Sequence, residues 1–222
     1  MKRVLIFSGK GGCGKTNLAR HIAVAAVREG FKVVTVDLDP QRGLSLWWER
    51  RPQTAVHLVN LEMDWDDAGD LIRLGDRPDG NGPYDVMIID TPAYGGYGNQ
   101  PANLKILMKG SDAVLIPSRP TTDDATSSIP MLGLPLREKV PGYFILNATK
   151  PRVNILKMKR RFAAAGEMCP IEIGDRTVFS SAADDGLTAL DLPWTPRISA
   201  AVDEMLGVWD YTRRNLGLPH VH

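Results

Sequence analysis

The chain has 222 residues, of which 43% are apolar, and its 27 lysines and arginines nearly balance its 26 aspartates and glutamates. This length is enough to bury a large core, and we expect one domain over residues 1–222 because no repeat or long linker divides the chain. The formal net charge of +1 excludes a protein that attracts nucleic acid with its whole surface, so such binding would need a local cluster of charge.

Neither a membrane-spanning segment nor a disulfide framework is indicated. No run approaches the roughly 18 consecutive apolar residues of a membrane-spanning helix. Only two cysteines occur, Cys13 and Cys169, which suits a reducing compartment. Residues 1–7 form too short an apolar run for a signal peptide and are interpreted as a first strand. We therefore expect a cytoplasmic protein without a membrane partner.

Short apolar runs alternate with longer amphipathic segments along the chain. A helix is expected over residues 17–29, ending at Gly30, and a last helix over residues 196–216. Residues 50–84, with several prolines and glycines, are expected to hold only short elements and loops. Continuous apolar runs indicate buried parallel strands, which we expect at residues 4–7, 33–36, 86–89, 113–116 and 143–146. The order predicts an α/β fold with a doubly wound, mostly parallel sheet and helices on both faces.

A glycine-rich loop over residues 9–16 follows the first expected strand and opens the first expected helix. Two glycines, a lysine and a hydroxyl residue at these offsets form the pattern that cradles nucleotide phosphates in the P-loop NTPase fold, whereas the alternative is a turn without function. Lys15 is expected to reach the β- and γ-phosphates, and Thr16 to hold magnesium. The predicted ligands are ATP and Mg²⁺, and the expected contacts are Gly11, Gly12, Cys13, Gly14, Lys15, Thr16 and Asn17.

Carboxylates follow two of the expected strands, at the same edge of the sheet as the glycine loop. Asp90 stands where such proteins place the acidic residue that holds magnesium through water, although it could instead cap the turn before Thr91. Asp37 and Asp39 lie on the same side of an extended segment, so one can serve the metal while the other positions water. We expect Thr16, Asp37 and Asp90 at the metal.

These segments together resemble the ParA/MinD group of deviant-Walker P-loop ATPases, specifically the short ParA-type partition proteins. The most specific mark is Lys10, which matches the family's signature lysine and by resemblance would touch the phosphates of a dimer partner. Residues 36–41 match the first switch, and by position Asp39 inherits the contact to the hydrolytic water. Residues 88–92 match the second switch, whose motion would use Gly95, Gly96 and Gly98. The resemblance implies catalytic roles for Lys10, Lys15 and Asp39.

Three positions depart from the family's pattern or match it weakly. Asn17 replaces a second threonine, which would alter contacts to the α-phosphate, and Cys13 replaces a small apolar residue. Asn147 follows the expected strand at 143–146, where related proteins contact the base, but it could equally be a turn residue.

A cluster of positive charge lies between residues 150 and 166, where no acidic residue occurs. On a helix starting near Asn154, an apolar seam would lie beside a basic strip that suits sequence-independent binding to DNA phosphates. A merely solvated helix face is the alternative. The expected DNA contacts are Lys157, Lys159, Arg160 and Arg161.

The resemblance implies a cytoplasmic ATP hydrolase of weak intrinsic rate that forms a homodimer on ATP and then binds non-specific DNA on the nucleoid. Hydrolysis stimulated by a ParB-like or adaptor protein would release it, and its task would be plasmid or chromosome partition. One alternative is a related ATPase that positions a protein organelle or a DNA-transfer complex. Another is a P-loop kinase or ligase acting on a small substrate.

Overall fold

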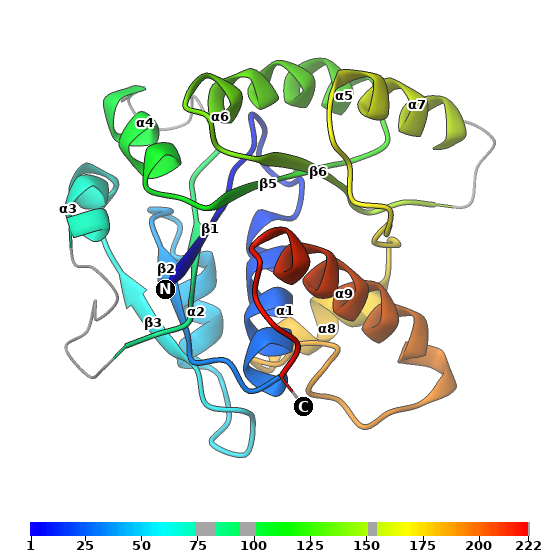
Figure 1. Cartoon of the computed structure of the whole chain (residues 1–222). Helices are drawn as coiled ribbons and strands as arrows, with labels where there is room; N and C mark the ends of the chain where they lie inside the picture. Colours follow the sequence, from blue (N-terminus) through cyan, green and yellow to red (C-terminus); the bar gives the residue numbers. More distant parts are fainter. Residues whose placement is uncertain (74–82, 94–100, 151–154, 222) are drawn as a thin grey trace.

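Six parallel strands form one sheet in the computed structural model, which describes residues 1–73, 83–93, 101–150 and 155–221 (Figure 1). Their order across the sheet is β3-β2-β4-β1-β5-β6, so β1 lies centrally between β4 and β5. The strands are β1 (Lys2–Ile6), β2 (Val33–Asp37), β3 (Val59–Glu62), β4 (Val86–Asp90), β5 (Ala113–Ser118) and β6 (Gly142–Leu146). This confirms the predicted doubly wound α/β P-loop NTPase fold.

Helices cover both faces of the sheet, as Figure 1 shows. One face carries α1 (Lys15–Arg28), α2 (Gly43–Glu49), α8 (Thr177–Asp184) and α9 (Pro196–Asn215). The other carries α3 (Ala68–Arg73), α4 (Pro101–Lys109), α5 (Thr122–Ser128), α6 (Gly133–Arg137) and α7 (Ile155–Ala165), with the 3₁₀ turns η1 (Trp65–Asp67) and η2 (Ile129–Leu132). The alternating side chains of β1 divide the core accordingly: Val4 and Ile6 face the first layer, whereas Leu5 and Phe7 face the second.

The five predicted strands and the two predicted helices are confirmed to within about two residues at each end. The sequence analysis missed β3, which lies in the stretch where only short elements were expected. This strand is at the sheet edge and only half-buried, so Val59-Asn60-Leu61-Glu62 mixes apolar and polar residues instead of forming a continuous apolar run. The glycines proposed for the second switch, Gly95, Gly96 and Gly98, lie outside the described residues, as does Arg152 of the basic cluster.

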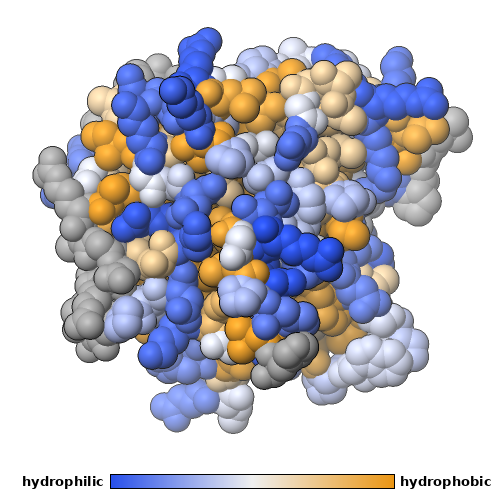
Figure 2. All heavy atoms as spheres, viewed as in Figure 1, coloured by the Kyte–Doolittle hydropathy of each residue, from blue (hydrophilic) through white to orange (hydrophobic). Residues whose placement is uncertain are grey.

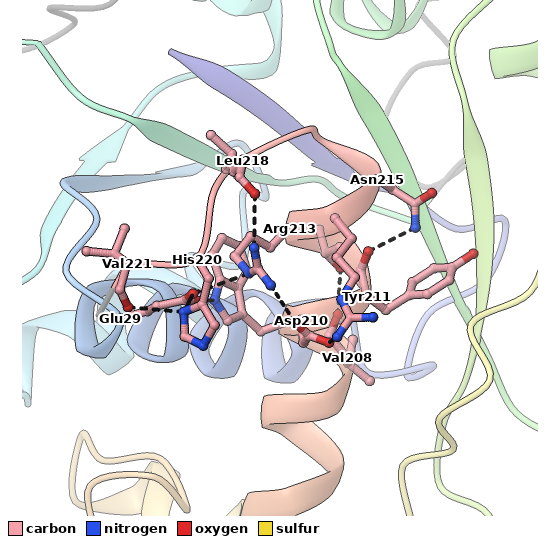
Figure 3. A network of polar contacts seen from close by, with 12 residues as sticks. Glu29, Val208, Asp210, Tyr211, Arg213, Asn215, Leu218, His220 and Val221 are labelled. Atoms are coloured by element: carbon pink, nitrogen blue, oxygen red, sulfur yellow. Dashed lines mark hydrogen bonds and ion pairs between the residues drawn. The ribbon is translucent and has the colours of Figure 1, made fainter.

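The end of the chain is held against the end of α1 by a polar network around Arg213 (Figure 3). The buried guanidinium donates to the carbonyl of Leu218 and to Asp210, and it lies 3.2 Å from a carboxylate oxygen of Glu29. Arg213 therefore stabilises the tail and is unavailable to extend a basic surface. No helix of the described residues has the length and apolar character needed to cross a membrane.

His21 links α1 to the loop after α8. Its Nε2 accepts the N–H of Ala189 at 3.1 Å, so Nδ1 carries the proton and donates to the carbonyl of Asn17 at 2.8 Å. The ring is fully buried and meets Phe179 edge to face. Burial lowers the pKa of His21 to about 4 and outweighs the opposing hydrogen bond to Asn17.

This shift predicts a loss of stability in acid. The unfolded histidine, with a pKa near 6.5, binds a proton more readily than the folded one, so protonation favours unfolding as the pH falls from about 6.5 to about 4. The expected loss is about 3 kcal/mol. His21→Gln retains an acceptor but does not titrate, so its unfolding free energy from urea denaturation should decline less over this window. An equal decline in both proteins would contradict the assignment.

Candidate nucleotide-binding site

The glycine loop joins β1 to α1 at the carboxyl edge of the sheet. Gly12 and Gly14 have φ angles of 71° and 95°, which side-chain-bearing residues adopt only with strain. Gly14 caps α1 and, having no side chain, supplies no acceptor to the first turn of the helix. The first backbone N–H groups of α1 are therefore available to an anion, as the phosphate-binding prediction requires.

Asn147, at the end of β6, braces this loop from the side. Its Nδ2 donates to the carbonyl of Cys13 at 2.7 Å, and a Cβ on Gly14 would stand only 1.9 Å from the same nitrogen. Only glycine fits at position 14. The side-chain N–H group of Asn147, which we expected to contact the base, is thus engaged with the loop. The contact of Asn147 with adenine stays a prediction, and it would have to be made by the Oδ1 atom.

Lys15 and Thr16 open α1 next to the ends of β2 and β4. Lys15 is 7% exposed, whereas Thr16 is half-buried, and the start of α2 at Gly43 lies against the Thr16 side chain. Strand register places Asp90 beside Asp37 on one side and beside Ile6 on the other. The structure therefore brings the expected lysine, hydroxyl and carboxylates together at one edge of the sheet.

Asp90 is a buried carboxylate that makes no close hydrogen bond among the described residues, although the Thr16 hydroxyl is near enough to lower its pKa. Its side chain is 0% exposed, and neither oxygen has a hydrogen-bond partner among the described residues. Burial raises the pKa of Asp90 to about 7, with Asp37 and Asp39 adding to the rise, while Thr16 and Lys15 oppose it. A buried carboxylate of this kind is stabilised by a cation, so the residues fit the predicted magnesium site.

Asp37, the other carboxylate expected at the metal, already accepts hydrogen bonds from the backbone. One of its oxygens accepts the N–H of Asp39 at 3.0 Å, and the other accepts the N–H groups of Leu44 and Ser45 at 3.0 and 2.8 Å. The carboxylate thereby satisfies donors at the start of α2 and fixes the turn after β2. These contacts give Asp37 a structural task, and its place at the metal together with Thr16 and Asp90 stays a prediction.

Magnesium commonly keeps several waters and binds through one or two carboxylates together with substrate phosphates. In keeping with this, the described part of the chain contains no group of three or more His, Cys, Asp or Glu placed to hold a metal by itself. A magnesium ion at this edge would therefore need nucleotide phosphates as well as Thr16 and Asp90.

The turn that carries Asp39 is held by its own contacts. The Asp39 carboxylate accepts the N–H of Gln41 at 3.0 Å, and its carbonyl accepts the N–H of Arg42 at 2.7 Å. Arg42 has a φ of 55° and forms ion pairs with Glu49 and Glu62. The turn is thus ordered, with Asp39 half-buried at the edge of the site.

Arg20 was not identified as a site residue from the sequence. From α1 it donates to the carbonyl of Gly43 at 2.6 Å, and its guanidinium carbon lies 5.7 Å from the centre of the Trp47 ring. Burial lowers its pKa to about 10, and Asp90 and Asp37 oppose the change. Arg20 therefore ties the first helix to the start of α2, directly behind the Asp39 turn.

Lys10 lies on the outer side of the glycine loop. Its side chain is 49% exposed, and Nζ is 3.6 Å from a carboxylate oxygen of Asp124, which is 6% exposed. Asp124 also binds the hydroxyl of Thr121 at the start of α5. The sequence offered one sign of this ion pair, the acidic residues Asp123 and Asp124 after the expected strand at 113–116, but we did not predict it.

Two hollows adjoin the loop. One of about 440 Å³ is lined by Arg119, Thr121 and Lys150, and another of about 500 Å³ is lined by Asn17, Arg20 and Asn147. Ala148 and Asp175 line both. The space beside the phosphate-binding loop is therefore large enough for a nucleoside, between the ends of β6 and α8.

The basic strip on α7 is only partly as expected. Lys157, Arg160 and Arg161 are exposed, and Met158 and Phe162 pack into the core. Figure 2 shows hydrophilic side chains over the upper right of the molecule, where α7 lies in Figure 1.

Lys159 lies outside the exposed part of this strip, which corrects the sequence-based expectation. It is half-buried and forms an ion pair with Glu172, an acidic residue in the segment that follows α7. Lys150, just before the helix, is likewise paired, with Asp175. The positive charge offered to solvent by α7 is therefore that of Lys157, Arg160 and Arg161.

Similarity to known proteins agrees with this geometry. A probable plasmid-partitioning protein ParA from Thermus thermophilus is 43% identical over 58 residues, which are 24% of this chain and only 18% of that protein. A maintenance of carboxysome distribution protein A from Halothiobacillus neapolitanus is 28% identical over 205 residues, covering 88% of this chain and 89% of that protein. The fold matches that of the septum site-determining protein MinD from Pyrococcus horikoshii in complex with Mg-ADP, with a TM-score of 0.76 and 18% identity over 97% of each chain.

The family model for the CobQ/CobB/MinD/ParA nucleotide binding domain matches residues 4–188, which contain the glycine loop, both switches and the strands that position them. The match covers most of the chain. The chain therefore belongs to the CobQ/CobB/MinD/ParA nucleotide-binding family, whose ParA and MinD members are P-loop ATPases.

Proposed function

We propose that this protein is an ATP-dependent dimerising switch for DNA partition, and the observation that carries the proposal is the position of Lys10. This lysine belongs to the phosphate-binding loop but lies half exposed on its outer side, tied to Asp124. A cation so placed can reach a nucleotide held by a second copy of the chain, as an arginine finger does. ATP would thus be enclosed between two protomers.

Within one protomer, the geometry supports the following roles. The N–H groups of the glycine loop and Lys15 bind the phosphates, while Thr16 and Asp90 hold the metal. When bound, magnesium neutralises phosphate charge. Asp39, at the edge of the site, positions and activates the attacking water. Hydrolysis to ADP and phosphate is slow on its own and is stimulated by a ParB-like or adaptor protein.

Release of the γ-phosphate would be sensed by the segment around Asp39. This segment is fixed through Asp37 and Arg42, and Arg20 ties the following helix to α1. Loss of a phosphate contact would shift this turn and α2 together, because their hydrogen bonds are shared. Opening of the dimer would follow.

The exposed part of the α7 strip supports DNA binding by the dimer. Lys157, Arg160 and Arg161 offer three positive charges per protomer, and a dimer presents six, although the net charge of the chain is only +1. Such an arrangement binds DNA phosphates without reading sequence, and its affinity depends on doubling the strip. The dimer would associate with the nucleoid while ATP is bound.

The cargo has two candidates. Partition of a plasmid or chromosome is favoured by the Thermus thermophilus relative, although that similarity covers a short segment. The Halothiobacillus neapolitanus relative, which takes its name from carboxysome distribution, aligns over most of both chains. Positioning of a protein organelle by the same cycle is therefore the second candidate. Cargo identity follows from the partner that stimulates hydrolysis, and pull-down with the Asp39→Ala protein and ATP would identify it.

Dimer formation is tested by size-exclusion chromatography with light scattering in the presence of ATP and Mg²⁺. Asp39→Ala should stall hydrolysis and accumulate dimer, whereas Lys10→Ala/Asp39→Ala should stay monomeric because the contact across the interface is lost. The matched control is Lys32→Ala/Asp39→Ala, which removes an exposed lysine just before the amino end of β2, away from the glycine loop. This protein should dimerise. Asp39→Ala that binds ATP yet remains monomeric would refute the sandwich dimer.

DNA binding is tested by fluorescence anisotropy with an arbitrary duplex over a series of salt concentrations. Arg160→Gln/Arg161→Gln should bind at least tenfold more weakly than the parent with ATP, and the slope of log affinity against log salt should fall by about 3.6 per dimer, because four phosphate contacts are lost. Arg28→Gln/Lys32→Gln removes the same charge elsewhere and should change little. Binding that is equally strong without nucleotide would contradict the gating of DNA binding by ATP.

A further inference from the structure

Arg119 is the first residue after β5, the strand that pairs with β1 on the side away from β4. It therefore lies at the carboxyl edge of the sheet, next to the strand that leads into the glycine loop. The N–H of Thr121 donates to its carbonyl at 2.8 Å, which closes a tight turn around Pro120. The sequence analysis did not consider this residue.

The side chain of Arg119 reaches the glycine loop. Its Nη2 atom lies 3.8 Å from the position that a Cβ on Gly12 would occupy, an ordinary van der Waals contact. Gly12 is exposed and has a positive φ. The guanidinium thus lies beside the glycine loop that is expected to bind the phosphates.

Arg119 also differs from the neighbouring cations in having no partner. Lys10 pairs with Asp124, Lys150 with Asp175, and Arg176 with Glu204. Among residues 1–73, 83–93, 101–150 and 155–221, no hydrogen bond or ion pair engages the Arg119 guanidinium, which is exposed at the wall of the 440 Å³ hollow. Its nearest influence is electrostatic, since it adds to the effect of Lys150 in lowering the pKa of Asp175.

We propose that Arg119 is a further phosphate-binding residue, whose guanidinium donates to the β- or γ-phosphate of ATP held by its own chain. The inference rests on the proposed ATP-binding function. A planar guanidinium matches two phosphate oxygens at once, and an unpaired one loses no internal contact on binding. Two cations then divide the work: Arg119 acts on the nucleotide of its own protomer, and Lys10 acts on that of the partner.

This division predicts that the contribution of Arg119 depends on the number of phosphates. AMP lacks the groups that Arg119 would contact, so its affinity should be independent of the residue. ATP should depend on it strongly, and ADP should depend on it to the extent that the β-phosphate is the ligand. A contact to the base or ribose in the adjoining hollow would instead affect all three nucleotides equally.

The test measures the dissociation constants of ATP, ADP and AMP with Mg²⁺ by isothermal titration calorimetry. Arg119→Gln should weaken ATP binding about tenfold and leave AMP unchanged, while Arg119→Lys, which keeps the charge but loses the two-oxygen contact, should give an ATP affinity between those of the parent and Arg119→Gln. Arg137→Gln is the matched control, since Arg137 is an exposed arginine at the end of α6, near the amino end of β6 and not at the carboxyl ends of the strands. Melting temperatures without nucleotide should agree among these proteins.

Three outcomes would overturn the proposal. These are unchanged ATP affinity in Arg119→Gln, an equal loss for AMP, and an effect that disappears when Lys10→Ala keeps the protein monomeric. The last result would assign Arg119 to the partner's nucleotide. A separate variant, Lys15→Ala, tests the ATP site itself: retention of ATP affinity there would contradict the proposed function, whereas a failure confined to Arg119 would leave that function standing.

Discussion

The carboxylate of Asp37 is the interaction on which the geometry of the site depends. It is 1% exposed and accepts three backbone N–H groups, so it joins the end of β2 to the Asp39 turn and to the start of α2. A charged group buried so deeply is stable only because its oxygens are engaged. Any movement of the Asp39 turn must therefore carry α2 with it. Trp47 extends this coupling, because it lies on α2 and donates to the carbonyl of Leu187.

The same edge of the sheet combines an engaged carboxylate with an unengaged one. Asp37 has its donors inside the protein, whereas the adjacent Asp90 has none among the described residues. Burial without compensation is costly for Asp90, and a cation supplied together with phosphate removes that cost. The N–H groups at the start of α1 have the opposite preference, because they favour an anion such as phosphate. A metal–nucleotide complex would supply both the cation that Asp90 favours and the anion that the start of α1 favours. This explains why the two positions lie at the ends of neighbouring strands.

Charge outside this site is distributed in a similar way, between paired and unpaired cations. Lys159 and Arg213 are neutralised by Glu172 and by Glu29 with Asp210, so they serve the fold. Arg160 remains at the surface on α7, and Arg119, which has no partner in the part of the chain that the structure describes, remains at the surface beside the glycine loop. A net charge of +1 is thus compatible with local groups of exposed cations such as the one on α7.

Apolar periodicity and motif spacing are local properties, so they were enough to predict the parallel sheet, the glycine loop and the carboxylates at the strand ends. They missed β3, whose half-exposed edge position leaves a mixed pattern. The hydrogen bonds of the carboxylates could not be predicted in this way: Asp37 accepts three backbone N–H groups, whereas Asp90 makes no close hydrogen bond among the described residues. Nor could the contact of the Asn147 amide with the loop at Cys13, 134 positions away. Such features depend on contacts between residues far apart in the chain. These contacts form only when the strands and helices pack together, and they give the individual site residues different roles.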